Sequence, residues 1–451
     1  MSATERPASP PPVVPDAARP ALSRARYGLL ACLFVITAIN YLDRTNLSVA
    51  LPHIKEELHL SGTQQGLLLS SFGWAYLLLQ VPAGRLIDRV GAKLAFGYAL
   101  VGWSLATFVV AAARSFVPLV GIRVALGAFE APAFPSNNRL VVNWFPGRER
   151  GRATATYTSG EYIGLAVAAP VLSLLTVHFG WRSVFVITGI VGLLFSVVWF
   201  AKVYDRPEHS PKVSAAELAH IRQPDELESA EEIAAAKEQA AVLDTSVWAD
   251  LRVLLSNRRL WGMYIGQFAS ASVLFFFLTW FPSYLVEEKH MGIIKAGFWA
   301  SAPYLAALVG TMAGGAWSDR MLNSGRFSRT FARKAPVMIG FVLASVIVCA
   351  NFTNSVPLVI TFMSVAFFAQ GLMQNSWALF SDAVPRRLTG TGGGVFSFAA
   401  NAGGVLTPLV IGVIVDRTGS FAWALGYIAI VVLAGLLAYA LLIDKVERVE
   451  G

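Results

Sequence analysis

The sequence predicts an all-α membrane protein with twelve transmembrane helices, arranged as two pseudo-symmetric six-helix bundles around a central cavity. Three observations lead to this fold class. Hydrophobic residues make up 55% of the 451-residue chain and charged residues only 14%. Twelve apolar stretches are each long enough to cross a bilayer, which takes about 20 residues. A loop motif of the first half also recurs in the second half.

The composition excludes a soluble protein of this length. A typical soluble domain carries about 25% charged residues, and a single soluble core stops growing near about 250–300 residues. The mean hydropathy of +0.57 therefore means that much of the apolar surface faces lipid. The net charge of +8 does not indicate nucleic acid, because the basic residues lie in short loops between apolar runs. Cys32 and Cys349 lie within such runs, which argues against a disulfide framework or a thiolate metal site.

The expected spans follow a proline-rich segment. Residues 1–26 contain few large apolar side chains and are expected to form a disordered cytoplasmic tail, and no cleavable signal peptide is evident. The expected spans are 27–50, 63–84, 94–113, 116–140, 153–177, 183–203, 260–286, 296–317, 335–351, 356–381, 391–415 and 420–443.

The basic residues predict the orientation of these spans. With the N-terminus in the cytoplasm, 28 of the 36 Lys and Arg residues fall on the cytoplasmic side and 6 on the outer side. Cytoplasmic loops of membrane proteins carry such an excess of positive charge. We therefore expect a multi-pass protein of the bacterial inner membrane with both termini in the cytoplasm.

The longest polar interruption separates six spans from six. It covers residues 204–256, is rich in acidic residues and is expected to act as a linker, with a regulatory partner site as the alternative. The predicted organisation is a tail (1–26), a six-helix bundle (27–203), a cytoplasmic linker (204–256), a second six-helix bundle (257–443) and a cytoplasmic tail (444–451).

The two halves repeat a loop motif. Gly84-Arg85-Leu86-Ile87-Asp88-Arg89 follows the second span, and a weaker copy, Gly315 to Arg320, follows the eighth. Asp88, Arg85 and Arg89 are candidates for a charged latch that holds the halves together in one state and breaks in the other. The alternative for the basic residues is that they only set the topology.

This motif, its copy and the six-plus-six layout resemble the major facilitator superfamily over residues 25–445. Parallel repeats around a central cavity are one way in which secondary transporters are built. The resemblance implies a carrier that exposes its cavity to one side of the membrane at a time.

Five ionisable residues lie inside predicted spans, where each costs about 2.5–3.5 kcal/mol on insertion scales and is therefore a functional candidate. They are Asp43 and Arg44 in the first span, Arg123 and Glu130 in the fourth, and Glu161 in the fifth. Adjacent residues on a helix point about 100° apart, so Arg44 can face a cavity while Asp43 faces a neighbouring helix. Structural ion pairs between spans are the alternative for these charges.

The second half offers neutral polar candidates instead. These are Gln267, Gln374, Asn375, Ser376, Ser397 and Asn401. Arginines suit an anion, carboxylates suit protons, and neutral donors and acceptors suit the hydroxyls of a polyhydroxylated acid. Among the aromatic residues, Tyr41 and Trp377 are the preferred candidates for cavity walls.

Within the superfamily, the sequence resembles the anion:cation symporters, and most of all the proton symporters of D-galactonate, glucarate and hexuronate. The resemblance rests on Asn40-Tyr41-Leu42-Asp43-Arg44, Ser71-Phe72-Gly73-Trp74-Ala75-Tyr76, Phe129-Glu130-Ala131-Pro132, Gly266-Gln267-Phe268 and Gly393-Gly394-Val395-Phe396, among other strings. It implies proton-driven import of a sugar acid.

The resemblance also implies residue roles. Asp43 and Glu130 would be the protonation sites, with Arg123 interacting with Glu130, and Arg44 would bind the substrate carboxylate. Tyr41, Tyr76, Gln267, Ser376 and Trp377 match positions that contact the sugar acid. The sequence departs from the galactonate transporters at Glu161, where glutamine is typical, at Gln374, which replaces a small hydroxyl residue, and at Ser397, which replaces an asparagine. Asn401 would compensate for the last change from one turn further on.

Two other functions remain open from the sequence alone. One is transport of a different organic anion, such as an aromatic carboxylate or an organophosphate, and the other is a membrane-bound nutrient sensor that moves nothing. An enzyme is not expected, because no nucleophile–base pair or phosphate-binding loop is evident. We expect no cofactor and no metal, and the expected partners are a small carboxylate, protons and the lipid bilayer, with a monomeric chain and no nucleic acid.

Overall fold

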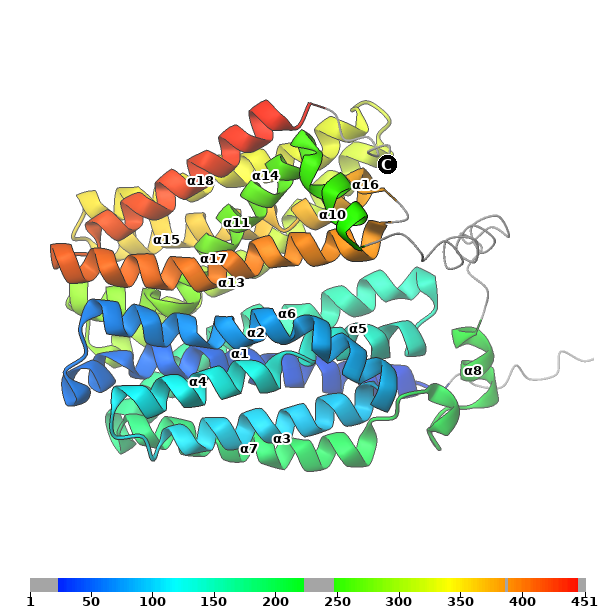
Figure 1. The fold of residues 1–451 in the computed structure, drawn as a ribbon, viewed down its shortest axis with the longest axis horizontal. Helices are drawn as coiled ribbons and strands as arrows, with labels where there is room; N and C mark the ends of the chain where they lie inside the picture. The colour runs from blue at the N-terminus through cyan, green and yellow to red at the C-terminus, as the bar shows by residue number, and fades with distance from the viewer. Residues whose placement is uncertain (1–22, 223–246, 386–387, 445–451) are drawn as a thin grey trace, which may run out of the picture.

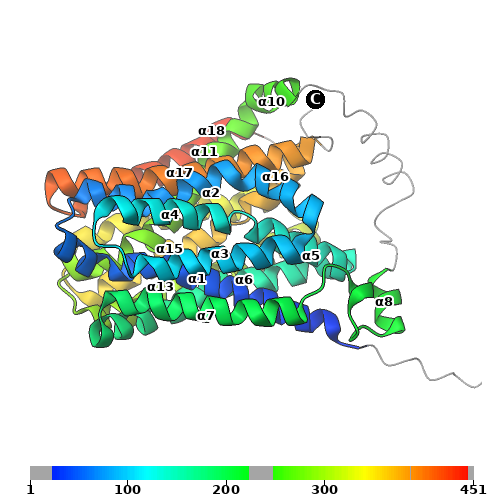
Figure 2. The same ribbon diagram turned by 60° about the horizontal axis from the view of Figure 1, so that its bottom comes forward.

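The computed structural model describes residues 23–222, 247–385 and 388–444. Two helical bundles lie side by side, the first formed by the N-terminal half of the chain and the second by the C-terminal half (Figure 1). Both views place the short helices α8 (Ala215–Ile221) and α10 (Val247–Ser256) at the same end of the bundles, which we call the α8 end (Figure 2).

The first bundle contains seven helices that make six spans. They are α1 (Ala25–Leu58), α2 (Gly62–Val90), α3 (Ala92–Val110), α4 (Phe116–Glu130), α5 (Ala133–Trp144), α6 (Gly147–Phe179) and α7 (Trp181–Lys202). Turns between them use local signals. Ser61 and Gln64 form a capping box at the start of α2, and Gly91 and Gly180, with φ of 85° and 78°, connect consecutive helices.

The second bundle follows the linker, in which a short 3₁₀ helix (Pro207–His209) precedes α8. The helices of the bundle are α11 (Arg258–Thr279), α12 (Phe281–Ser283), a π-helical turn (Tyr284–Glu288), α13 (Ile293–Asn323), α14 (Arg329–Ala344), a 3₁₀ stretch (Ser345–Phe352), α15 (Val356–Met373), α16 (Ser376–Ala383), α17 (Thr389–Thr418) and α18 (Ala422–Leu442).

The two bundles pack their helices in the same pattern. In the first, α1 packs on α6, α2 on α4 and α3 on α7; in the second, α11 packs on α17, α13 on α15 and α14 on α18. The contacts between bundles are related in the same way, because α2 packs on α17 and α13 packs on α6. The fold class predicted from the sequence, two related six-helix bundles, is therefore confirmed.

Eleven helical segments of the described residues are long and apolar enough to cross a membrane. The remaining predicted span is α2, which bends by 55° between Gly62–Gln80 and Pro82–Val90, because proline interrupts the hydrogen-bond ladder of a helix. The fourth span also breaks, between Glu130 and Ala133, at Pro132. Several helices extend beyond the predicted limits, since the prediction followed hydrophobicity and α1, α6 and α13 continue into polar residues.

The first helix begins earlier than predicted and is held by the linker. Ala25 opens α1, and the buried carboxylate of Glu217 in α8 accepts hydrogen bonds from the backbone amides of Ala25 (3.1 Å) and Arg26 (3.2 Å). The guanidinium of Arg26 pairs with both Glu217 and Glu149 at 3.1 Å. A carboxylate at a helix N-terminus stabilises the helix dipole, so α8 is attached to the start of α1. Of the predicted tails and linker, residues 1–22, 223–246 and 445–451 lie outside the described residues.

Close helix contacts rest on individual glycines, and α13 provides a matched pair. A Cβ at Gly310 would lie 2.0 Å from the carbonyl oxygen of Phe368 in α15, whereas a Cβ at Gly315 meets nothing within 4 Å. We expect Gly310→Ala to lower the melting temperature of the purified protein by several degrees, because α13 and α15 must separate. Gly315→Ala should leave it unchanged or raise it slightly. Equal melting temperatures for the two variants would contradict the packing described here.

Candidate functional site

A polar cavity of about 440 Å³ lies between the two bundles. Residues from both halves form its walls, several of them next to the helix breaks of the fourth and tenth spans. They are Tyr41, Arg44, Tyr76, Gln80, Phe134, Pro135, Asn138, Glu161, Gln267, Ser270, Ala271, Leu274, Phe275, Gln370, Gln374, Trp377, Ser397, Ala400 and Asn401. Nine of the ten residues that the sequence analysis assigned to substrate binding belong to this lining, and the tenth, Ser376, contacts it.

The wall contributed by the first bundle surrounds a guanidinium with aromatic rings. Tyr41 and Arg44 are three residues apart on α1 and therefore share a helix face. The Arg44 guanidinium lies 5.0 Å from the ring centroid of Tyr41, 4.8 Å from that of Phe72 and 4.9 Å from that of Tyr76. Cation–π attraction from three rings fixes the position of the charge. Arg44 is 8% exposed, which leaves it in contact with the cavity but largely dehydrated.

Arg44 forms a buried ion pair with Glu130. Its Nε lies 2.9 Å from Oε2 of Glu130, which is fully buried at the end of α4. The break at Pro132 ends α4 at this residue and leaves the carboxylate facing α1. A buried pair is strongly destabilised if only one partner leaves, because the other charge then lacks compensation. The positions of Arg44 and Glu130 are therefore linked.

The family resemblance implied an interaction of Arg123 with Glu130, and the two residues lie within electrostatic reach of each other without forming an ion pair. Among the described residues, Arg123 forms no ion pair within 4.0 Å and instead places its guanidinium 5.4 Å from the ring centroid of Phe72. Arg123 and Glu130 are seven residues apart, two turns or about 10.5 Å along the axis. Glu130 therefore finds its partner on α1 rather than on its own helix, and Arg123 remains buried behind it.

Asp43 points away from the cavity into the interior of the first bundle. It is 1% exposed, and its Oδ1 accepts a hydrogen bond from Asn46 Nδ2 at 3.2 Å. Asn46 in turn donates to the hydroxyl of Thr188 in α7 at 2.7 Å. The 100° between adjacent helix positions thus separates the two charges: Arg44 reaches the cavity, and Asp43 contacts a polar chain that leads to α7.

The wall contributed by the second bundle is neutral. Gln267 on α11 lines the cavity, and the hydroxyl of Ser376 donates to its Oε1 at 2.9 Å, so Ser376 orients Gln267 rather than lining the cavity itself. Gln374 precedes α16 at the break of the tenth span. On α17, Asn401 Nδ2 donates to the carbonyl oxygen of Ser397 at 2.9 Å.

The sequence analysis missed several lining residues. Gln80 lies one turn beyond Tyr76, Gln370 one turn before Gln374, and Ser270 three residues after Gln267. In each case, helical spacing from an identified residue was a usable signal. Gln370 also connects the bundles, because the hydroxyl of Tyr162 in α6 donates to its Oε1 at 3.3 Å.

Polar contacts between the bundles close the end opposite α8, which we call the sealed end. Lys55 near the end of α1 pairs with Glu287. Asp416 near the end of α17 accepts hydrogen bonds from the amide of Gly62 (3.1 Å) and the hydroxyl of Thr63 (2.6 Å) at the start of α2. Gly66 and Gly412 bring α2 and α17 into backbone contact just below. The two bundles are therefore in direct contact at the sealed end.

The latch candidates lie at the other end. Arg85, Asp88 and Arg89 are all exposed near the α8 end of α2, and none of them forms an ion pair within the part of the chain that the structure describes. In this state the bundles contact each other at the sealed end, whereas Arg85, Asp88 and Arg89 form no ion pairs with described residues. The structure therefore does not show the predicted latch in its closed form.

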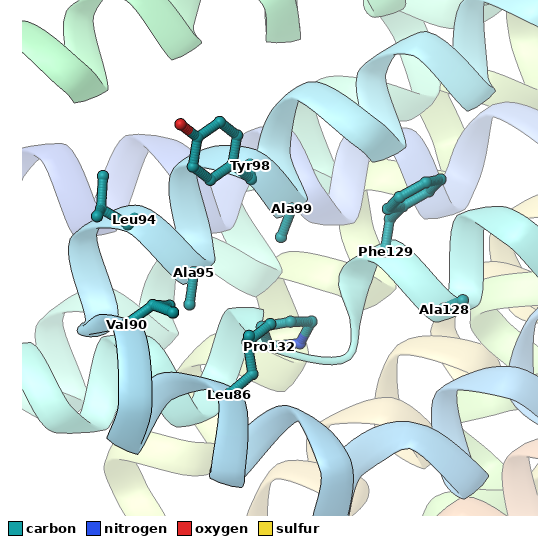
Figure 3. A pocket seen from close by; sticks show the side chains of 9 residues that line it. All are labelled: Leu86, Val90, Leu94, Ala95, Tyr98, Ala99, Ala128, Phe129 and Pro132. Atoms are coloured by element: carbon teal, nitrogen blue, oxygen red, sulfur yellow. The ribbon is translucent and has the colours of Figure 1, made fainter.

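A second hollow lies within the first bundle, on the surface between α2, α3 and the break after α4 (Figure 3). It has a volume of about 370 Å³ and no ionisable side chain other than the phenol of Tyr98; its lining is Leu86, Val90, Leu94, Ala95, Tyr98, Ala99, Ala128, Phe129 and Pro132. Such a surface suits contact with acyl chains. The cavity between the bundles is therefore the candidate functional site.

Two related six-helix bundles with a polar cavity between them are the architecture of a secondary membrane transporter. The chain belongs to the Major Facilitator Superfamily: the model of that family matches residues 33–324 and 321–450. The chain is thus a multi-pass member of a transporter family and not an enzyme.

Curated relatives match along almost the whole chain. A "D-galactonate transporter" of Escherichia coli O6:H1 is 42% identical over 96% of this chain and 99% of its own length. A "Probable galactarate/D-glucarate transporter GudP" of Bacillus subtilis is 40% identical over 94% of this chain and 93% of its own length. The resemblance stated from the sequence motifs is confirmed.

Solved structures share the fold. A bacterial homologue of the human lysosomal transporter Spinster, in an inward-facing and occupied conformation, superposes with a TM-score of 0.70. The match covers 92% of this chain and 96% of that one at 18% sequence identity, so it supports the architecture and carries no conclusion about substrate.

Proposed function

We propose that this protein imports a sugar acid by proton symport across the bacterial inner membrane. The observation that carries the proposal is the cavity itself, in which one guanidinium faces a wall of neutral hydrogen-bonding side chains. A guanidinium binds a carboxylate through paired hydrogen bonds, and glutamine, asparagine and serine offer both donors and acceptors to hydroxyls. Relatives that are named as transporters of D-galactonate and of galactarate or D-glucarate support the same substrate class.

The proposal includes an orientation. The positive-inside rule assigns the α8 end to the cytoplasm, because the loops at this end carry most of the basic residues. Both termini then lie in the cytoplasm, and the state described here, closed at the sealed end, is one that faces inward. Import requires the reverse state as well, in which the sealed end opens and the α8 end closes.

The ion pair between Arg44 and Glu130 supplies a means of coupling. A substrate carboxylate that binds Arg44 competes with Glu130 for the same guanidinium. Glu130 would then be a buried carboxylate without its ion-pair partner, which is costly unless it takes up a proton. Substrate and proton therefore bind together, and they leave together when Glu130 recovers Arg44. Asp43, next to Asn46 and buried one position away, is the second proposed protonation site.

The membrane potential would assist this cycle. Two protons that accompany one monoanion carry one net positive charge inward, and each charge gains about 2.3 kcal/mol per 100 mV.

In right-side-out vesicles, an inward proton gradient should drive accumulation of an aldonate, aldarate or hexuronate above its external concentration. No uptake of any sugar acid across a broad panel would contradict the proposal, and uptake of aromatic carboxylates or organophosphates alone would assign the cavity to another anion.

Asp43→Asn should abolish gradient-driven accumulation, because the site can no longer exchange a proton. Counterflow, in which labelled substrate enters vesicles that are preloaded with unlabelled substrate, should persist, since the cavity is intact. The measurement is initial uptake with and without the gradient. Normal accumulation by Asp43→Asn would remove Asp43 from the coupling mechanism.

Arg44→Ala should weaken sugar-acid binding at least about 100-fold, which is the order expected when a buried charged hydrogen-bonding partner is removed. Isothermal titration of the purified protein measures this change. Arg114→Ala, a change at an exposed arginine of the loop before α4, is the control and should bind like the wild type. Binding that is retained by Arg44→Ala would show that the substrate carboxylate is held elsewhere.

Asp88→Asn should favour the inward-facing state, because the proposed latch acts only when the α8 end is closed. A cysteine introduced at Asn138, which lines the cavity, should react faster with an impermeant maleimide in inside-out vesicles when Asp88→Asn is also present. Glu208→Gln, which affects a surface pair with Arg222 at the same end, serves as the control. Unchanged labelling would leave Asp88 without a latch role.

A further inference from the structure

The cavity contains one carboxyl group. Among the residues that line it, all within the described part of the chain, Arg44 has the only guanidinium or amine and Glu161 the only carboxyl group. Arg44 is the single cation available to a bound anion. Glu161 faces the same cavity and is not required by the coupling scheme above, which uses Asp43 and Glu130.

The packing of α6 on α1 holds Glu161 in place. Gly160 and Gly164 flank it, and a Cβ at either position would lie 2.6–2.7 Å from a carbonyl oxygen of α1, that of Phe34 or of Ala38. The two backbones therefore touch on both sides of Glu161. Its carboxylate lies beside the hydroxyl of Tyr41 and within electrostatic reach of Arg44, so it borders the position where a substrate carboxylate would bind.

The chemistry of such a wall distinguishes sugar acids by their number of carboxylates. A hydroxyl can donate a hydrogen bond to Glu161, whereas an ionised carboxylate has no proton to donate and meets acceptor against acceptor. The second bundle offers amide and hydroxyl groups to the remainder of the substrate but no cation among its lining residues. A second substrate carboxylate would therefore be an uncompensated charge in a cavity that already contains the carboxyl group of Glu161, and two adjacent carboxyl groups oppose each other's ionisation.

We propose that Glu161 makes the cavity selective for sugar acids with one carboxylate, such as aldonates and hexuronates, and excludes aldarates, which have two. This inference rests on the proposed function and specifies its substrate class. Selectivity arises here from a repulsive element as much as from an attractive one: Arg44 accepts one carboxylate, and Glu161 penalises the next while accepting hydrogen bonds from the polyol.

D-Galactonate and D-galactarate form a matched pair for the test, because they share a carbon skeleton and differ only in a terminal hydroxymethyl or carboxylate group. The protein is reconstituted in liposomes, and initial uptake of each compound is measured under the same inward proton gradient. We expect the wild type to favour galactonate by at least about tenfold. Glu161→Gln should reduce this preference by about tenfold, the factor that corresponds to about 1.4 kcal/mol.

Two further variants separate charge from shape. Glu161→Asp keeps the carboxylate and should retain the preference, even if its overall rate is lower. Ser270→Ala changes the cavity wall without changing its charge and should also retain the preference. Where Glu161→Gln transports too slowly to measure, competition of galactarate against galactonate in equilibrium binding to the purified variant gives the same ratio without transport.

The outcomes distinguish this inference from the proposed function. The role of Glu161 would be overturned if the wild type took up both compounds equally well. It would also be overturned if Glu161→Gln kept the wild-type preference in uptake or in binding. Either result would leave the proposed function as a sugar-acid symporter intact. If the wild type neither binds nor transports any sugar acid, both the role of Glu161 and the proposed function are contradicted. A galactonate preference that falls only in Glu161→Gln would support the inference.

Discussion

The buried ion pair between Arg44 and Glu130 is the interaction on which the rest of the site depends. It connects α1 to the end of α4 at 2.9 Å, inside a ring of aromatic side chains and largely out of contact with water. Neither charge is stable there alone. Any anion that takes the arginine must therefore be accompanied by a change at the carboxylate, and a proton is the simplest one. In the proposed mechanism, substrate recognition and proton binding become one event because they share a single guanidinium.

The surrounding structure maintains this pair next to the cavity. The break at Pro132 ends α4 at Glu130, the rings of Tyr41, Phe72 and Tyr76 fix the arginine, and Gly160 and Gly164 bring α6 against α1. The first bundle thus contains all the charges of the site. The second bundle contributes neutral donors and acceptors, so in the proposed transport cycle hydrogen bonds rather than ion pairs would form and break across the cavity.

Much of this arrangement could be predicted from the sequence, since it depends on helical periodicity. The 100° between adjacent helix positions separated Arg44 from Asp43, and charges within apolar runs identified the first bundle as the charged half. Gln80 and Gln370 were missed although each lies one turn from an identified residue, because glutamine in a span is weaker evidence than a charge. Periodicity relates residues of one helix only. It could not show that Glu130 forms its ion pair with Arg44 of α1 rather than with Arg123 of its own helix. It also could not show that Ser376 acts by orienting Gln267.

The central claim is that substrate binding displaces Glu130 from Arg44 and so draws a proton into the protein. It is tested most directly by mixing purified protein with D-galactonate in a weakly buffered solution that contains a pH indicator. The account predicts that binding removes protons from solution in proportion to the protein bound, and that Glu130→Gln binds substrate with a smaller proton uptake. Substrate binding without any proton uptake at a pH where the wild type transports, or an uptake that Glu130→Gln leaves unchanged, would contradict it.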